Sequence, residues 1–285
     1  MAREIIIHNA SKTKTPLAIV DIIGNDNYGY GVFDQYYRLD MDKISEEFLL
    51  VFDNDCIGRG VQIIGLSSNK KLHLGLSLPT TENDIKMLYR LATRIANLWK
   101  ANHVLVEEDK VDIKDLDIYV KHDIDMNIKL LRDADNIFTS EYIDFPCATN
   151  PISFTASQLC NYASDMRDFE TFLHEKQSIG AYFSAPLFYE VNDVLNVLYV
   201  VFDEGHIILP DTPQMTFRSK GNEAVCDNAF VACSNLFPNE KLSRISFGDF
   251  MERVPTEKKS RFDCQHTLVE PMSNEELQEI FKLSK

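Results

Sequence analysis

The chain has 285 residues, of which 45% are hydrophobic and 26% charged, and its formal net charge is −15. This composition predicts one large globular domain or two ordinary ones and excludes a collagen-like or largely disordered chain. The acidic balance and the absence of a dense Lys/Arg run argue against a nucleic-acid-binding protein, with Arg90 and Arg94 as the candidates for a local basic patch.

The first part of the chain alternates strand patterns with turn-forming residues. Polar breaks at 25–27 and at 53–55, the latter extended by Gly58 and Gly60, separate the β-rich runs. Strands are expected at 3–8, 28–39, 47–52, 61–66 and 71–78.

The clearest helix pattern follows these strands. Its apolar residues recur at helical spacing and form one stripe, made of Ile85, Leu88, Tyr89, Ala92, Ile95, Ala96 and Trp99. Thr81 is the expected N-cap, and Asp84 approximates the acid of a capping box. Pro79 keeps the preceding residue extended, so the strand before it ends just ahead of the helix.

The remaining segments are assigned in chain order. In the first half, a strand is expected at 103–107 and a helix at 121–134, followed by a proline-containing connector at 138–151 and a helical pair at 155–177. In the second half, strands are expected at 179–191, 194–202, 206–209 and 263–269, and helices at 247–254 and 273–283. The segment at 222–235 is ambiguous. Asn192-Asp193 is a plausible two-residue hairpin turn between the first two of these strands.

A capped-helix module, at 79–91 and again at 271–283, occurs in both halves. The matched pairs are Pro79/Pro271, Thr81/Ser273, Asp84/Glu276, Ile85/Leu277, Leu88/Ile280, Tyr89/Phe281 and Leu91/Leu283. The strand-to-turn runs 49–53 and 199–203 also resemble each other, although the intervals to the module differ. Any strand-to-helix junction selects such caps, but the matched apolar positions and the upstream likeness favour an internal duplication.

These patterns predict an α+β protein built from two related units, each an antiparallel sheet backed by a C-terminal helix. The expected organisation is an N-terminal unit at 1–137, a connector with helical segments at 138–177 and a C-terminal unit at 178–285. The six cysteines, which form no CxxC pair, are expected to be reduced thiols.

The run from Leu76 to Thr81, followed by Asp84, Ile85 and the long helix, resembles an uncharacterised bacterial family, a domain of unknown function. The tail at 264–283 is also similar, and the resemblance covers nearly the whole chain. It implies a duplicated SecB-like fold and no activity. SecB itself is a tetrameric chaperone that binds unfolded chains on apolar surface, so transferring that role would be analogy of fold alone.

Two loops have the composition of ligand-binding loops without the required pattern. Residues 25–31 are rich in Asn and Gly but lack the spacing of a phosphate-binding loop, which favours a turn leading into a strand. Asp53, Asp55 and Gly58 are reminiscent of a calcium loop, but Ile57 and Ile64 stand where ligands are needed, so we reject that interpretation.

Two clusters of reactive residue types are also best explained structurally. Cys264 and His266 lie about 7 Å apart along a strand, too far for a nucleophile–base pair. His122, Asp123 and Asp125 suit a metal but are expected as helix-start residues, and the acidic stretch Asp112, Asp115 and Asp117 leaves weak divalent-cation binding as the alternative. The sequence therefore identifies no catalytic residue and predicts no cofactor or metal.

The aromatic residues Phe183, Phe188 and Tyr189 lie in a nearly continuous apolar segment, which predicts either burial on both faces or one exposed apolar face. The leading hypothesis is a non-enzymatic cytoplasmic protein, chaperone-like or otherwise protein-binding, whose partner is another polypeptide or a second copy. The acidity is explained by solubility or by a cationic partner such as a basic protein or an unfolded chain. No nucleic-acid partner is expected because of the acidic balance, and no membrane partner is expected because no apolar run approaches the length of a membrane span and no segment resembles a signal peptide. The alternative is an enzyme with a dispersed active site.

Overall fold

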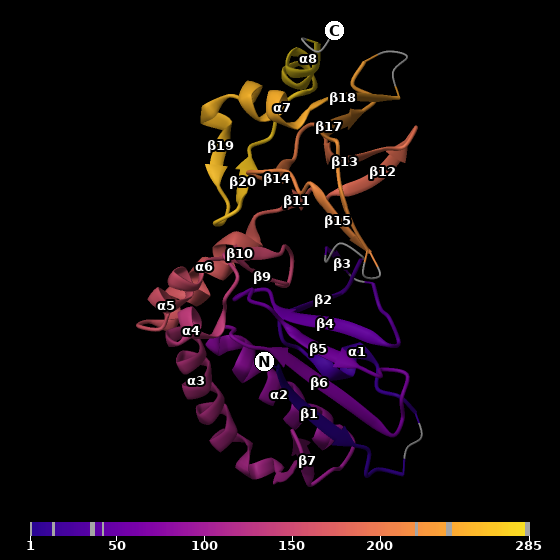
Figure 1. The fold of residues 1–285 in the computed structure, drawn as a ribbon. Helices are drawn as coiled ribbons and strands as arrows, with labels where there is room; N and C mark the ends of the chain where they lie inside the picture. Colours follow the sequence, from indigo (N-terminus) through magenta and orange to yellow (C-terminus); the bar gives the residue numbers. More distant parts are fainter. Residues whose placement is uncertain are drawn as a thin grey trace. The chain divides into compact units, whose positions relative to one another are not determined.

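The computed structural model describes residues 2–12, 15–34, 38–41, 43–219, 222–237 and 241–282. It divides the chain into two compact units, Met1–Ser178 and Ile179–Lys285, each of which combines helices with mainly antiparallel strands (Figure 1). The chain is therefore α+β, as predicted. The segment 138–177, expected to connect two units, is part of the first one.

The first unit contains an antiparallel sheet with the strand order β3-β2-β4-β5-β6-β1-β7-β8. Its strands are β1 (Ala2–His8), β2 (Tyr28–Phe33), β3 (Leu39–Met41), β4 (Phe48–Asp53), β5 (Val61–Ile64), β6 (Lys71–Ser77), β7 (His103–Val106) and β8 (Asp109–Asp112). Alternate residues of a strand point to opposite faces. Leu49 and Val51 accordingly face the main core, whereas Phe48 and Leu50 belong to a smaller cluster on the other face.

The long helix α2 (Glu82–Leu98) packs on the main core face of this sheet. Ile85, Leu88 and Ile95 are fully buried, which confirms the predicted stripe. The Thr81 hydroxyl accepts a 3.0 Å hydrogen bond from the Asp84 N–H, so the predicted N-cap forms. The other helical segments of this unit are α1 (Ile19–Ile23), the 3-10 turn η1 (Ile113–Asp115), α3 (Leu116–Arg132), α4 (Ala134–Ile137), α5 (Ala156–Tyr162) and α6 (Met166–Ser178).

The predicted helical pair at 155–177 corresponds to α5 and α6. These helices pack with the short two-stranded sheet of β9 (Ile143–Phe145) and β10 (Ile152–Phe154). Phe154 has its ring centroid 5.8 Å from Phe169 and 6.3 Å from Tyr162, so strand and helices share an aromatic cluster. In addition α5 contacts α3 and α6 contacts α2, which is why this segment belongs to the first unit.

The second unit has two four-stranded sheets, ordered β11-β14-β20-β19 and β12-β13-β17-β18, and a two-stranded β15-β16 hairpin. The strands are β11 (Ala181–Phe183), β12 (Leu187–Val191), β13 (Val194–Val201), β14 (His206–Pro210), β15 (Thr216–Ser219), β16 (Asn222–Val225), β17 (Asn228–Ser234), β18 (Leu242–Ser246), β19 (Lys259–Arg261) and β20 (His266–Val269). The helical segments are α7 (Phe247–Arg253), η2 (Thr256–Lys258) and α8 (Asn274–Lys282).

Two pairs of strands in this unit are parallel, β11 with β14 and β13 with β17, so its sheets are not purely antiparallel as expected. The chain leaves β13 for the other sheet and returns as β17 beside it in the same direction. The predicted turn at Asn192-Asp193 does form, with φ values of 51° and 62° that suit a two-residue hairpin.

The capped-helix module is present locally in both units. In α8, Ser273 and Glu276 form a complete capping box, with the Ser273 N–H donating to the Glu276 carboxylate at 2.7 Å. Leu277, Ile280 and Phe281 are buried, as are their counterparts in α2, while Leu283 lies outside the described residues. Within the described part of the chain, no helix has both the length and the apolar character needed to cross a membrane. The six cysteines are free thiols.

Candidate functional site

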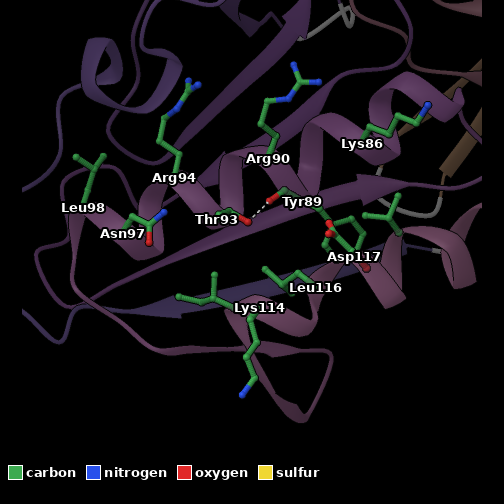
Figure 2. A pocket seen from close by; sticks show the side chains of 12 residues that line it. Lys86, Tyr89, Arg90, Thr93, Arg94, Asn97, Leu98, Lys114, Leu116 and Asp117 are labelled. Carbon is green, nitrogen blue, oxygen red and sulfur yellow. Dashed lines mark hydrogen bonds between the residues drawn. The ribbon is translucent and has the colours of Figure 1, made fainter.

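An open groove of about 920 Å³ lies along α2 in the first unit (Figure 2). Its second wall is formed by η1 and the beginning of α3. The lining residues are Lys86, Tyr89, Arg90, Thr93, Arg94, Asn97, Leu98, Ile113, Lys114, Leu116, Asp117 and Val120. In Figure 2, Arg90 and Arg94 extend from one side of α2, and Lys114 lies across the groove near Leu116.

The charge of this groove differs from that of the chain. Four cations, Lys86, Arg90, Arg94 and Lys114, line the groove together with one carboxylate, Asp117, although the whole chain carries a net charge of −15. The three cations of α2 are four residues apart, which places them on one side of the helix about 6 Å from one to the next. Arg90 and Arg94, the residues named from the sequence as a local basic patch, both line the groove.

Three of these cations have carboxylate partners within the chain: Lys86–Glu82 at 2.6 Å, Arg94–Asp26 at 2.7 Å and Lys114–Asp112 at 3.4 Å. Arg90 instead donates a 2.8 Å hydrogen bond to the neutral Tyr28 hydroxyl and forms no ion pair with the described residues. Ion pairs at a protein surface contribute at most about 1 kcal/mol, so an incoming carboxylate competes readily for such cations. Arg90 is therefore the cation most available to a ligand.

The floor of the groove is apolar and firmly positioned. Tyr89 is buried, and its hydroxyl donates a 2.6 Å hydrogen bond to the Asp123 carboxylate. Burial and this carboxylate raise the pKa of Tyr89, so the phenol stays protonated and acts as a donor. Arg3 on β1 donates to the same carboxylate at 2.8 Å, which ties α3 to the sheet. Leu98, at 43% exposure, leaves an apolar side chain at one end.

A family model described as "Domain of unknown function (DUF4299)" matches residues 2–280. The chain belongs to this family. Membership of DUF4299 agrees with the resemblance seen in the sequence and attaches no activity to the groove. Neither a curated protein nor a solved structure matches the chain.

The metal-compatible residues of this DUF4299 member have structural partners. Asp123 is buried between Arg3 and Tyr89, and His122 lies beside it with Nδ1 3.2 Å from the carboxylate. Asp112 accepts a backbone bond from Lys114 and caps η1. Across the described ranges, no three His, Cys, Asp or Glu side chains are placed to hold a metal ion.

His266 is paired with Asp263, a residue that the sequence reasoning missed. The carboxylate lies 2.9 Å from His266 Nδ1 and also accepts the backbone N–H groups of Gln265 and His266. Asp263 thus forms the turn between β19 and β20, and the Phe183 ring packs on the imidazole with 5.1 Å between centroids. The spacing of three residues between Asp263 and His266 was the available signal.

The two loops with ligand-like composition are turns. Gly24, with φ of +62°, ends α1, and the chain continues through a turn into β2 as predicted. Asp53 accepts a 3.1 Å bond from the Asn83 side chain, and Asp55 accepts a 2.8 Å bond from Asn27. These contacts join the β4–β5 turn to its neighbours.

The apolar strands of the second unit have one buried face and one partly open face. Val197, Tyr199 and Val201 are at most 1% exposed and face the core. On the other face Leu187 and Leu198, which pair across β12 and β13, are half-buried. The aromatic segment is therefore neither fully buried nor an open groove.

Proposed function

We propose that this protein is a non-enzymatic binding module whose α2–α3 groove holds an acidic, amphipathic segment of another polypeptide. The observation that carries the proposal is the row of Lys86, Arg90 and Arg94 beside an apolar floor, on a chain that is acidic as a whole. Complementary charge then selects the partner, and the apolar floor supplies contact area.

The dimensions of the groove suit a helical segment. Lys86 and Leu98 are twelve residues apart on α2, so the groove is about 18 Å long. Carboxylates at positions i, i+4 and i+8 of a bound helix repeat about every 6 Å, as the cations of α2 do. Apolar residues on the adjacent stripe of the same segment would lie over Tyr89 and Leu116.

The composition of the groove supports binding over catalysis. Asp117 is its only carboxylate, and no histidine or cysteine lines it within the described residues. General acid–base catalysis most often relies on a histidine or on paired carboxylates, and the groove has neither among its described lining residues. A net charge of −15 also opposes a long nucleic acid, whose phosphates would meet repulsion beyond the groove.

We also propose that the two units arose by a SecB-like duplication and that the protein is cytoplasmic. In support of the duplication, β6 and β20, the strands that precede the two modules, each lie between two antiparallel neighbours. The likeness between the two units is limited to the strand before each module. The strands upstream, β4 and β13, which contain the similar runs 49–53 and 199–201, differ because β4 has antiparallel neighbours only and β13 has one parallel neighbour.

The test uses a labelled synthetic amphipathic peptide with Leu at i, i+3, i+4 and i+7 and Glu on its other positions, measured by fluorescence anisotropy against the full chain. Arg90→Glu is expected to weaken binding by about tenfold or more, because it reverses the charge of the most available cation. Lys110→Glu, the same change on exposed β8 outside the groove, is the matched control and should leave affinity unchanged.

Three outcomes would contradict the proposal. The first is that a peptide with Lys in place of Glu binds the protein as tightly as the acidic peptide does. The second is that a single-stranded oligonucleotide binds more tightly than the acidic peptide. The third is that Arg90→Glu and Lys110→Glu bind the acidic peptide with the same affinity. Sedimentation of the protein alone separates the remaining alternative, since a dimer that Arg90→Glu dissociates would place a second copy in the groove.

A further inference from the structure

A smaller cavity, of about 280 Å³, lies on the face of the first unit's sheet that points away from α2. Phe33, Phe48 and Leu50 give it an apolar wall. Its polar side chains are those of Arg59, Gln62 and Ser77. An apolar pocket with a few convergent polar groups is the usual form of a small-ligand site.

Arg59 is the unusual member of this set. It is only 8% exposed, yet it forms no ion pair with a carboxylate of the described residues. Its Nε donates to the Pro146 carbonyl at 3.2 Å and its Nη1 to the Pro79 carbonyl at 2.8 Å, while the guanidinium lies 4.4 Å from the centroid of the Phe145 ring. Buried cations normally have an anionic partner, because the desolvation of an unpaired charge is costly.

The remaining donor of Arg59 is open. Its Nη2 has no hydrogen-bond partner among the described residues. Among those residues Trp99 Nε1 is the only fully buried side-chain nitrogen or oxygen without a partner, so Arg59 Nη2 is not fully buried. Nη2 therefore reaches accessible space. The side-chain amide of Gln62 and the hydroxyl of Ser77 likewise make no hydrogen bond within the described residues. Three unpaired polar groups thus line one small cavity.

We propose that this cavity binds a small organic monocarboxylate. The carboxylate accepts hydrogen bonds from Arg59 Nη2, Gln62 and Ser77, and the apolar body of the ligand packs against Phe33, Phe48 and Leu50. The volume holds roughly nine water molecules at about 30 Å³ each, which matches a ligand the size of benzoate. The site shares no residue with the α2–α3 groove and does not depend on the function proposed for it.

Calorimetric titration of the full chain with benzoate tests the assignment, and benzyl alcohol serves as the neutral ligand of similar size. We expect benzoate to bind and to raise the thermal unfolding midpoint, and benzyl alcohol to do neither. Gln62→Leu and Ser77→Ala should each weaken benzoate binding by about tenfold. Ser67→Ala, in an exposed turn outside the cavity, should not. Arg59→Met should abolish binding.

Because Arg59→Met removes buried hydrogen bonds and can prevent folding, the decision rests on Gln62→Leu and Ser77→Ala, with folding checked by circular dichroism. Unchanged benzoate affinity in both folded variants would overturn the assignment. So would benzyl alcohol binding as tightly as benzoate, which would show a merely apolar cavity. The absence of benzoate binding to the wild type, or its displacement by inorganic phosphate at equal concentration, would overturn it as well.

Discussion

The backbone N–H of Arg59 donates a 2.8 Å hydrogen bond to the carboxylate of Asp84, although 25 residues separate the two in the chain. The same fully buried carboxylate accepts the Gly60 N–H at 3.2 Å and the Thr80 hydroxyl at 2.5 Å. Asp84 thereby joins the β4–β5 connection to the beginning of α2. A Cβ at Gly58 would collide with this carboxylate, so the connection requires glycine there.

Asp84→Ala should destabilise the first unit by about 4 kcal/mol, because it leaves three buried donors without an acceptor. The single tryptophan, Trp99, is buried in this unit, so its fluorescence during urea unfolding reports the loss directly. Glu276→Ala, at the matched position of the second module, is the control. Glu276 is only partly buried, and its replacement should cost several-fold less. Equal losses would contradict the role given to Asp84.

The stability of the first unit should depend on the protonation of Asp84. Burial raises the pKa of this carboxyl above its ordinary value of 3.8, against the opposing effect of its hydrogen bonds. The folded state therefore binds the proton more tightly than the unfolded state does. The resulting stabilisation is complete below pH 3.8 and is lost as pH rises through the folded pKa.

Asp84→Asn removes this dependence, so the wild type should lose free energy of unfolding relative to the variant as pH rises from about 4 toward neutrality. Urea titrations of both proteins at a series of pH values, again read from Trp99, measure the difference. A constant difference across the series would show that the pKa is not raised.

Cys56 should be almost inert toward alkylation in the folded protein. Burial, together with the nearby Glu170 carboxylate, raises its pKa to about 12, so at pH 8 the reactive thiolate is on the order of a thousandfold scarcer than for an ordinary cysteine. Pulsed iodoacetamide labelling and peptide mass spectrometry measure the rate. Glu170→Gln should accelerate it, and a native rate equal to that in guanidinium would refute the prediction.

Asp193→Gly should stabilise the β12–β13 hairpin by about 0.5 kcal/mol, because Asp193 has a φ of 62° that glycine adopts without strain. Hydrogen exchange of the β12 and β13 amides should slow accordingly. Asn192→Val, which forces a β-branched side chain into φ of 51° at the same turn, should accelerate exchange. Faster exchange in Asp193→Gly would mean that the Asp193 side chain supports the turn.

Local patterns were sufficient where neighbouring residues determine the structure. The Thr81 cap, the apolar stripe of α2 and the Asn192-Asp193 turn are such cases, because capping, helical periodicity and turn chemistry all act within a few residues. The helix expected at 121–134 begins five residues earlier, at Leu116, and the acidic residues Asp115 and Asp117 stand at its start. The ambiguous segment at 222–235 contains β16 and β17.

Contacts between residues far apart in the chain could not be predicted from the sequence. Arg59 stands between two glycines in an apparent turn, and nothing near it indicates that Pro79 and Pro146 supply its partners. The basic groove likewise depends on η1 and α3 lying beside α2. Arg90 and Arg94 were named from the sequence as a local basic patch. Lys86, about one turn earlier on the same helix, and Lys114, whose place beside α2 is set by tertiary packing, were not.

The position of β1 affects the order of events during synthesis. It lies between β6 and β7 inside the sheet, yet about 60 residues separate its end at His8 from the start of β6 at Lys71. At about 5 to 20 residues per second, β1 leaves the ribosome roughly 3 to 12 seconds before its first partner exists. An Ile-rich strand with both edges unpaired is a template for aggregation during that interval. The nascent chain should therefore depend on ribosome-associated holdases more than a chain whose sheet begins with a hairpin.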